Sequence, residues 1–184
     1  DYVELDNISV REIDPLSVSI AMDGRMTYAD EGEANNVFLL RWTNSTDSDY
    51  IRHRIDTRST DTGQLQYLQI TNTVLDLVSA ATDYYSPEIL VPYSHASRHG
   101  STFISGAANG VALATNTTPT ALPDLEAEDL DLAFDYMGTV GTFRVWDRDI
   151  GETGLVEATN PSLEPSLSLT FEGVGTNSFV VNDW

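Results

Sequence analysis

The sequence predicts an all-β fold, namely an antiparallel β-sandwich, from three observations. Runs of alternating apolar and polar residues recur along the chain, at intervals of roughly 8–15 residues. The segments between these runs contain Gly, Pro, Asn, Asp and Ser/Thr residues, which are typical of tight turns. No segment sustains a helical period beyond about two turns. Since an alternating strand buries one face and exposes the other, we expect two sheets packed around one core.

The first half of the chain supplies five expected strands. They cover residues 16–28, 37–42, 50–57, 64–71 and 74–79. In the third of these strands, Arg52 and Arg54 share one face, while His53 points to the other face and is interpreted as a core histidine. Residues 44–49 are expected to form a turn, and residues 83–92 a loop that contains two prolines.

The stretch from residue 96 to residue 147 carries the clearest alternation. Strands are expected at residues 96–105, 111–114, 130–135 and 139–146, and Asn109-Gly110 predicts a hairpin turn. One helical turn is expected near residues 154–158, followed by strands at residues 166–172 and 179–181.

One principal domain is expected, formed by residues 15–184. A chain of 184 residues suffices for a single sizeable core. Residues 1–14 are either the first strand of this sandwich or the closing strand of a sandwich that precedes it, with Asp14-Pro15 as the joint.

The composition excludes several classes of partner. The chain has 29 acidic and nine basic residues and a net charge of −20, and all of its basic residues are arginine. Such a surface repels the phosphates of nucleic acids and of anionic lipids, so we expect neither nucleic-acid binding nor membrane insertion. The absence of cysteine excludes disulfides and thiolate chemistry. Three explanations of the acidity remain open: solubility, adaptation to salty water, or loops that bind calcium.

Two Asp-x-Asp pairs are the candidate calcium ligands. Asp47 and Asp49 lie in one expected turn, and Asp147 and Asp149 lie in another. Carboxylate oxygens are the hard ligands that calcium prefers. However, Asx-rich turns also form without an ion, and that alternative stays open.

Patterns that would support catalysis are incomplete. Glycoside hydrolases of the retaining type hold two carboxylates about 5 Å apart, as residues two apart on a strand can be. Glu4-Leu5-Asp6 and Glu12-Ile13-Asp14 begin such a run, but neither continues to a further glutamate. No Gly-x-Ser-x-Gly nucleophile elbow is present. We therefore expect a non-catalytic protein, with polysaccharide cleavage as the less favoured alternative.

The order of parts between residues 96 and 147 resembles the second half of the concanavalin A-like (laminin G-like) jelly roll. The residues that carry this resemblance are the strand ending in Phe103-Ile104-Ser105-Gly106, the Asn109-Gly110 hairpin, a loop with two prolines, and the GTVGTFRVW run at residues 138–146. The resemblance implies a jelly-roll sandwich. Residues 6–12 (DNISVRE) are in turn similar to the closing strand of galactose-binding-type sandwich modules, which implies a neighbouring domain upstream.

The whole chain also resembles a C-terminal module of bacteriophage and gene-transfer-particle spike, fibre or tail proteins. The similar runs are residues 6–12, 24–30, 96–106, 118–125 and 161–172. This resemblance implies a virion protein that is displayed on the particle surface, and hence extracellular, as a homo-oligomer such as a trimer. Its implied partners are host surface polysaccharide or other virion proteins. Two functions follow: a module that binds host glycan, or a purely structural module for assembly.

Glycan binding requires an exposed aromatic face together with planar polar groups. Tyr84 and Tyr85 lie in an expected loop, where both rings are hard to bury. We predict that they contact glycan together with Tyr93, Arg98 and His99. His95 and His99 lie four residues apart on one strand face, where they either coordinate a metal or serve as polar residues of the sheet.

Overall fold

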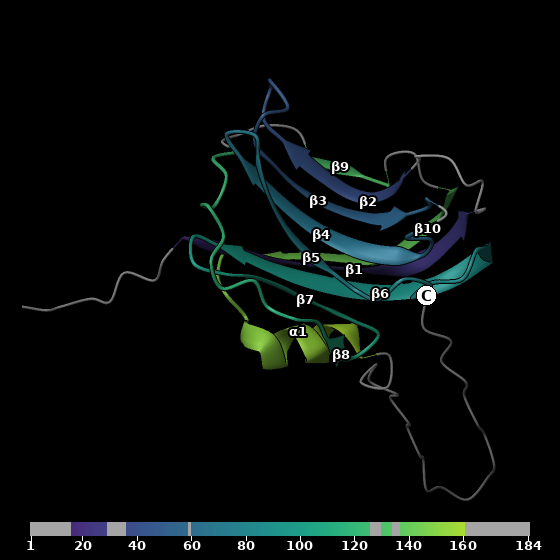
Figure 1. Cartoon of the computed structure of the whole chain (residues 1–184). Coiled ribbons are helices and arrows are strands. Elements are labelled where there is room, and N and C mark those ends of the chain that lie inside the picture. Colours follow the sequence, from purple (N-terminus) through teal and green to yellow (C-terminus); the bar gives the residue numbers. More distant parts are fainter. Residues whose placement is uncertain (1–15, 29–35, 59, 126–129, 134–136, 161–184) are drawn as a thin grey trace, which may run out of the picture.

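The chain forms two antiparallel sheets with a helix on one side (Figure 1). The computed structural model describes residues 16–28, 36–58, 60–125, 130–133 and 137–160. Within these residues the elements are β1 (Ser17–Tyr28), β2 (Asn36–Thr43), β3 (Tyr50–Asp56), β4 (Gln64–Thr71), β5 (Val74–Ser79), β6 (Glu88–Gly100), β7 (Ile104–Ala108), β8 (Val111–Ala112), β9 (Leu130–Leu132), β10 (Met137–Trp146) and α1 (Gly151–Thr159). No helix in this part of the chain is long and apolar enough to cross a membrane.

The strands divide into two sheets of five. Sheet I has the order β10-β1-β6-β7-β8, and sheet II has the order β5-β4-β3-β2-β9. All neighbouring strands are antiparallel. Figure 1 shows sheet II above sheet I and α1 below sheet I, so the molecule has three layers. The predicted all-β sandwich is therefore confirmed.

The core lies between the two sheets and is built from alternate residues of each strand. On β1, Ile20, Met22 and Met26 point inward and are buried. Tyr67 of β4 is fully buried, and its hydroxyl donates a hydrogen bond of 2.7 Å to the Ala107 carbonyl of the facing sheet. Gly106 leaves room for this ring, because a Cβ at that position would lie 2.1 Å from the Tyr67 ring. Tyr67 thus fixes the spacing of the two sheets.

Helix α1 packs against the outer face of sheet I. Leu155 is fully buried there against Ala21, Ala96 and Ala107, which are small enough to let the helix approach. Before the helix, the Ser19 hydroxyl donates to the Arg148 carbonyl (2.8 Å) and accepts from the Ile150 amide (3.2 Å). These two bonds hold the loop between β10 and α1 against β1.

The structure corrects the sequence-based expectations in three places. The predicted loop at residues 83–92 is wrong after residue 87, because β6 already begins at Glu88. Proline has no amide proton to donate to a neighbouring strand. Pro92 is tolerated in β6 because β7 pairs only with residues 95–99, so no backbone hydrogen bond to β7 is lost at Pro92. The strand expected at residues 96–105 is two strands, β6 and β7, joined by a tight turn in which the Gly100 amide donates to the Phe103 carbonyl (2.9 Å). The expected single helical turn is the nine-residue helix α1.

Other expectations are confirmed or lie outside the described residues. The Asn109-Gly110 turn has positive φ at both positions (49° and 79°), as a type I′ hairpin requires. The strands predicted in the first half of the chain correspond to β1 through β5. The strand expected at residues 130–135 is described as the short β9. The segments 1–14, 166–172 and 179–181 lie outside the described residues, so the proposed domain boundary stays a prediction.

Candidate functional site

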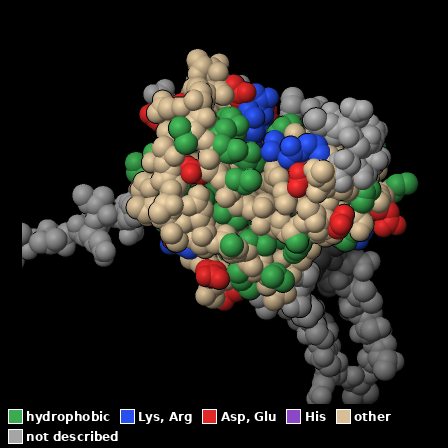
Figure 2. Space-filling view, in the orientation of Figure 1, with side chains coloured by type: hydrophobic (Ala, Val, Ile, Leu, Met, Phe, Trp, Pro, Cys, Tyr) green, Lys and Arg blue, Asp and Glu red, His purple; other side chains and the backbone are tan. Residues whose placement is uncertain are grey.

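Planar polar side chains gather on the outer face of sheet II. Because side chains alternate along β3, Arg52 and Arg54 point outward while His53 points into the core. The register places Arg41 of β2 beside Arg52, and Gln66 of β4 beside Arg54. Figure 2 shows arginine side chains gathered at the top of the molecule, over this sheet. We call this surface the arginine face, which comprises Phe38, Arg41, Tyr50, Arg52, Arg54, Asp56, Arg58, Gln64 and Gln66.

At one end of the arginine face, Asp47 holds two arginines. It lies in the turn between β2 and β3, and its carboxylate accepts hydrogen bonds from Arg52, from Arg41 (3.4 Å) and from the Thr43 hydroxyl (2.7 Å). Partial burial alone would raise the pKa of Asp47. The hydrogen bonds from Thr43 and Arg52 outweigh that effect, so the pKa lies below its ordinary value. Asp47 therefore stays ionised and fixes both guanidinium groups.

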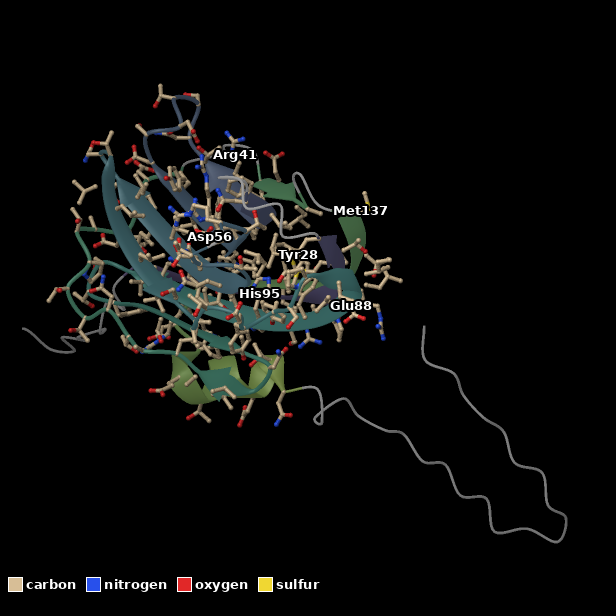
Figure 3. The ribbon with its side chains drawn as sticks, turned by 45° about the vertical axis from the view of Figure 1, so that its right-hand side comes forward. Tyr28, Arg41, Asp56, Glu88, His95 and Met137 are labelled. Atoms are coloured by element: carbon tan, nitrogen blue, oxygen red, sulfur yellow. The ribbon has the colours of Figure 1, made fainter. Side chains whose placement is uncertain are left out.

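At the other end, a second network fixes Arg54. Its Nε donates to Gln66 Oε1 (2.8 Å), and Gln66 Nε2 donates to Gln64 Oε1 (2.6 Å) and to Asp56 Oδ2 (3.3 Å). Asp56 is fully buried and accepts from Arg58 Nε at 3.0 Å. Figure 3 shows Arg41 and Asp56 on sheet II, whereas the labelled Tyr28, Glu88, His95 and Met137 belong to sheet I. Each planar group is thus oriented by a neighbour before any ligand arrives.

Burial and pairing set the pKa values within this network. Burial lowers the pKa of Arg54, and although Asp56 opposes the shift, Arg58 and Arg52 add to it. Burial would raise the pKa of Asp56, but the hydrogen bonds from Arg58 hold it below the ordinary value. Asp56 is therefore a fixed acceptor rather than a proton donor.

Two aromatic rings border the arginines. The Arg52 guanidinium lies 3.6 Å from the centroid of the Tyr50 ring and 5.8 Å from that of Phe38. Such stacking restrains the plane of the Arg52 guanidinium group. Both rings are only partly buried. The surface therefore combines cationic forks, amide groups and apolar ring faces.

The glycan contacts predicted from the sequence do not share one exposed surface. Tyr85, Tyr93 and His99 are buried, with exposed fractions of 4%, 3% and 0%. Tyr84 is partly buried, packs edge-on against Tyr85 and donates to the Ala108 carbonyl (2.8 Å). Arg98 lies on the outer face of sheet I in an ion pair with Asp149 (2.8 Å). The structure does not bring these five residues together.

The three histidines form one buried cluster between the sheets, near the labelled His95 in Figure 3. The Ser97 hydroxyl lies between His53 Nε2 (2.7 Å) and His99 Nε2 (2.9 Å), and Gln69 Oε1 lies 3.2 Å from His99 Nδ1. As expected, His95 and His99 share a strand face, but that face is the interior one. Burial lowers the pKa of His95 and of His99 to about 3. The cluster is therefore neutral and inaccessible.

The candidate calcium ligands are used by protein groups. Asp49 accepts from Asn44 Nδ2 (2.9 Å) and from the Asn72 amide (2.6 Å), while Asp149 accepts from Arg98 and from the Gly151 amide (2.7 Å). Asp47 binds the arginines described above, and Asp147 is exposed in a separate turn. Among the described residues, no group of three or more His, Cys, Asp or Glu side chains could hold a metal ion. The structure thus assembles no calcium site from these four aspartates.

Sequence reasoning assigned Arg52 and Arg54 to one strand face but missed the arginine face itself. The missing information is the pairing register, which aligns Arg41 and Gln66 with these two arginines. A single sequence gives the direction of side chains within a strand but not the partner across the sheet.

No family model matches this chain, and no curated protein sequence matches it. Solved structures do match. A Ruminococcus gnavus IT-sialidase CBM40 bound to alpha2,6 sialyllactose has a TM-score of 0.58 and 15% identity, and the match covers 80% of this chain and 85% of that one. A leech intramolecular trans-sialidase has a TM-score of 0.57 and 15% identity. The match covers 80% of this chain but only 24% of that one.

A third similar structure is a SAP-like pentraxin from Limulus polyphemus, with a TM-score of 0.50 and 11% identity, covering 80% of this chain and 73% of that one. At such low identities the likeness establishes the fold. The chain is an antiparallel jelly-roll β-sandwich, in agreement with the two observed sheets.

Proposed function

We propose that this domain is a non-catalytic carbohydrate-binding module that binds an acidic glycan on its arginine face. The observation that carries the proposal is the fixed row of Arg41, Arg52 and Arg54. These are three of only nine basic residues in a chain of net charge −20, and they lie on one sheet face. Random placement of charge on so acidic a protein does not explain why its cations are aligned and hydrogen-bonded there.

The chemistry of the arginine face suits a sugar that carries a carboxylate. Guanidinium groups bind carboxylates through paired, charge-assisted hydrogen bonds. The partly exposed Gln64 amide can exchange hydrogen bonds with sugar hydroxyls, and the partly exposed rings of Phe38 and Tyr50 offer apolar contact to the sugar ring, while the buried Gln66 and Asp56 orient the surface groups from beneath. The sialyllactose complex of the Ruminococcus gnavus CBM40 supports this ligand class.

The same residues argue against a hydrolase at this face. Cleavage of a glycosidic bond needs a carboxyl group that holds a proton near neutral pH. Asp47 and Asp56 are both bound to arginines, and their pKa values lie below the ordinary value. Neither carboxylate can therefore act as the general acid.

We place the module on a virion surface, in several copies, because the chain resembles spike, fibre and tail modules of bacteriophages. In that setting the partner is an acidic polysaccharide on the host cell. A single shallow site binds weakly, and several linked copies raise the avidity by orders of magnitude. Detection of the protein on purified particles by immunogold labelling tests this placement, and labelling confined to particle-free fractions would contradict it.

Arginine-to-alanine variants test the site directly. Calorimetric titration with sialyllactose should show saturable binding to the natural protein and a loss of about tenfold or more in R52A and in R54A, since each variant removes a charge-assisted contact. R148A is the matched control, because Arg148 is exposed and lies outside the arginine face, and its affinity should stay within about twofold. Unchanged affinity in R54A would overturn the assignment of the site.

Assembly is the second candidate function, and the edge strand β10 favours it. Met137, Val140 and Val145 of this strand are 70%, 38% and 45% exposed. Exposed apolar edges pair readily with another chain. Sedimentation analysis should then show an oligomer that V145K dissociates. A natural protein that stays monomeric at the highest soluble concentration would remove this candidate.

A further inference from the structure

A cavity with polar lining residues lies on the opposite side of the sandwich from the arginine face. It is a groove of about 360 Å³ on the outer face of sheet I, at the point where α1 ends. We call it the helix-end groove. Strands β1, β6 and β10 form its floor, and Ala158 and Asn160 form its wall. A volume of this size falls within the range of small-ligand sites.

The floor of the helix-end groove is shaped by a bulge in the pairing of β1 with β10. The register passes from Met22↔Phe143 to Gly24↔Val140, so Gly141 and Thr142 oppose Asp23 alone. The Asp23 carboxylate accepts a hydrogen bond from the Thr142 amide (3.1 Å). A Cβ on Gly141 would lie 2.4 Å from the same carboxylate, so a side chain there would displace it. Bulges of this kind commonly re-aim a side chain beside a binding site.

The lining of the helix-end groove alternates in charge. Arg144 pairs with Ala21, two residues before Asp23, and Arg25 follows two residues after it on the same strand face. The two arginines therefore stand on either side of one carboxylate, on backbone positions about 13 Å apart. Hydroxyl groups of Ser94, Thr139 and Thr142 complete the lining. A ligand that fits this pattern has an anionic group for an arginine and hydroxyl groups that donate to Asp23.

We propose that the helix-end groove is a second saccharide site, which takes one acidic sugar residue. The ligand class rests on the function proposed for the arginine face, whereas the location rests on the cavity and its bulge alone. The two sites face opposite sides of the sandwich, so one sugar residue cannot contact both. A domain with two such sites bridges neighbouring glycan chains, and this bridging adds avidity beyond that of copy number.

NMR titration of the isotope-labelled full chain with free N-acetylneuraminate tests the proposal. Two sets of amide shifts are expected, one around residues 24, 141 and 142 and the other around residues 52–56. R144A should abolish the first set and retain the second, R54A should do the reverse, and R148A should retain both. D23N is a second groove variant that keeps the shape of the side chain, and it should weaken the first set about tenfold.

The outcomes separate the two claims. Shifts at the arginine face alone would overturn the helix-end groove and leave the proposed function standing. Shifts at the groove alone would overturn the proposed site on sheet II and support the groove. A groove response that survives both R144A and D23N would also contradict this inference, and no response at either place would overturn both proposals.

Discussion

At the scale of single residues, the three buried histidines make the stability of the protein depend on pH. Each is fully buried, and burial lowers the pKa of all three, to about 3 for His95 and for His99. The pKa of histidine in an unfolded chain is about 6.5. Above that pH the histidines are neutral in both the folded and the unfolded state, so they add no pH dependence to the free energy of unfolding. Below it only the unfolded state takes up protons, so stability is lost as the pH falls from about 6.5 toward 3.

We therefore predict a steep loss of unfolding free energy in mild acid. Each histidine contributes at most about 1.4 kcal/mol per pH unit, so three contribute up to about 4 kcal/mol per unit. Urea denaturation at about pH 7, 6 and 5 measures this slope. His95 offers a matched variant, because neither of its ring nitrogens has a hydrogen-bond partner among the described residues. H95F should reduce the slope by about one third, and an unchanged slope would show that His95 is not buried as described.

Gly106 is the second residue-scale case. Its missing side chain leaves room for Tyr67, whose ring would lie 2.1 Å from a Cβ. We expect G106A to destabilise the protein by about 1–3 kcal/mol, as overpacked cores do. Chemical denaturation measures the change, with S101A at an exposed turn as the control. A loss below about 0.5 kcal/mol would mean that the two sheets separate more easily than this packing implies.

At the scale of elements, α1 is held by two buried side chains, Leu155 and Thr159, of which Leu155 supplies the apolar contact. Leu155 is fully buried on three alanines of sheet I, while Glu152 and Thr153 of the same helix are exposed. L155A should cost about 2–4 kcal/mol through lost burial and a cavity, whereas T153A should cost little. The same variant should weaken ligand binding in the helix-end groove, because α1 forms its wall. Retained stability in L155A would contradict this docking of the helix.

The elements also show which features of the fold the sequence predicted and which it did not. The alternation of apolar and polar residues located β1 through β5, although β4 is buried on both faces. The Asn-Gly pair located the hairpin because both residues tolerate positive φ. Alternation failed at the turn between β6 and β7, where Phe103 and Ile104 continue the pattern through the turn. It also failed for the two proposed binding surfaces, because the arginine face depends on strand register and the helix-end groove depends on a bulge. The buried positions of Tyr85 and Tyr93 follow from the packing of the two sheets, which no local pattern reveals.

At the scale of the whole molecule, the net charge of −20 opposes folding through self-repulsion. Salt screens this repulsion over about 10 Å at 0.1 M. We expect the melting temperature to rise by several degrees between about 0.05 M and 0.5 M sodium chloride, while affinity for an acidic glycan falls over the same range. Calorimetric melting and titration measure the two trends. A rise in affinity together with the rise in melting temperature would contradict the assignment of the arginines to ligand binding.

The central claim is that an acidic sugar is bound by the arginine face, and a comparison of sialyllactose with lactose tests it most directly. The two ligands share the neutral disaccharide and differ by the sugar that carries the carboxylate. Calorimetric titration of the natural protein should show affinity for sialyllactose at least about tenfold higher than for lactose, and R54A should abolish that difference. Equal affinity for the two ligands, or a preference that persists in R54A, would contradict the account.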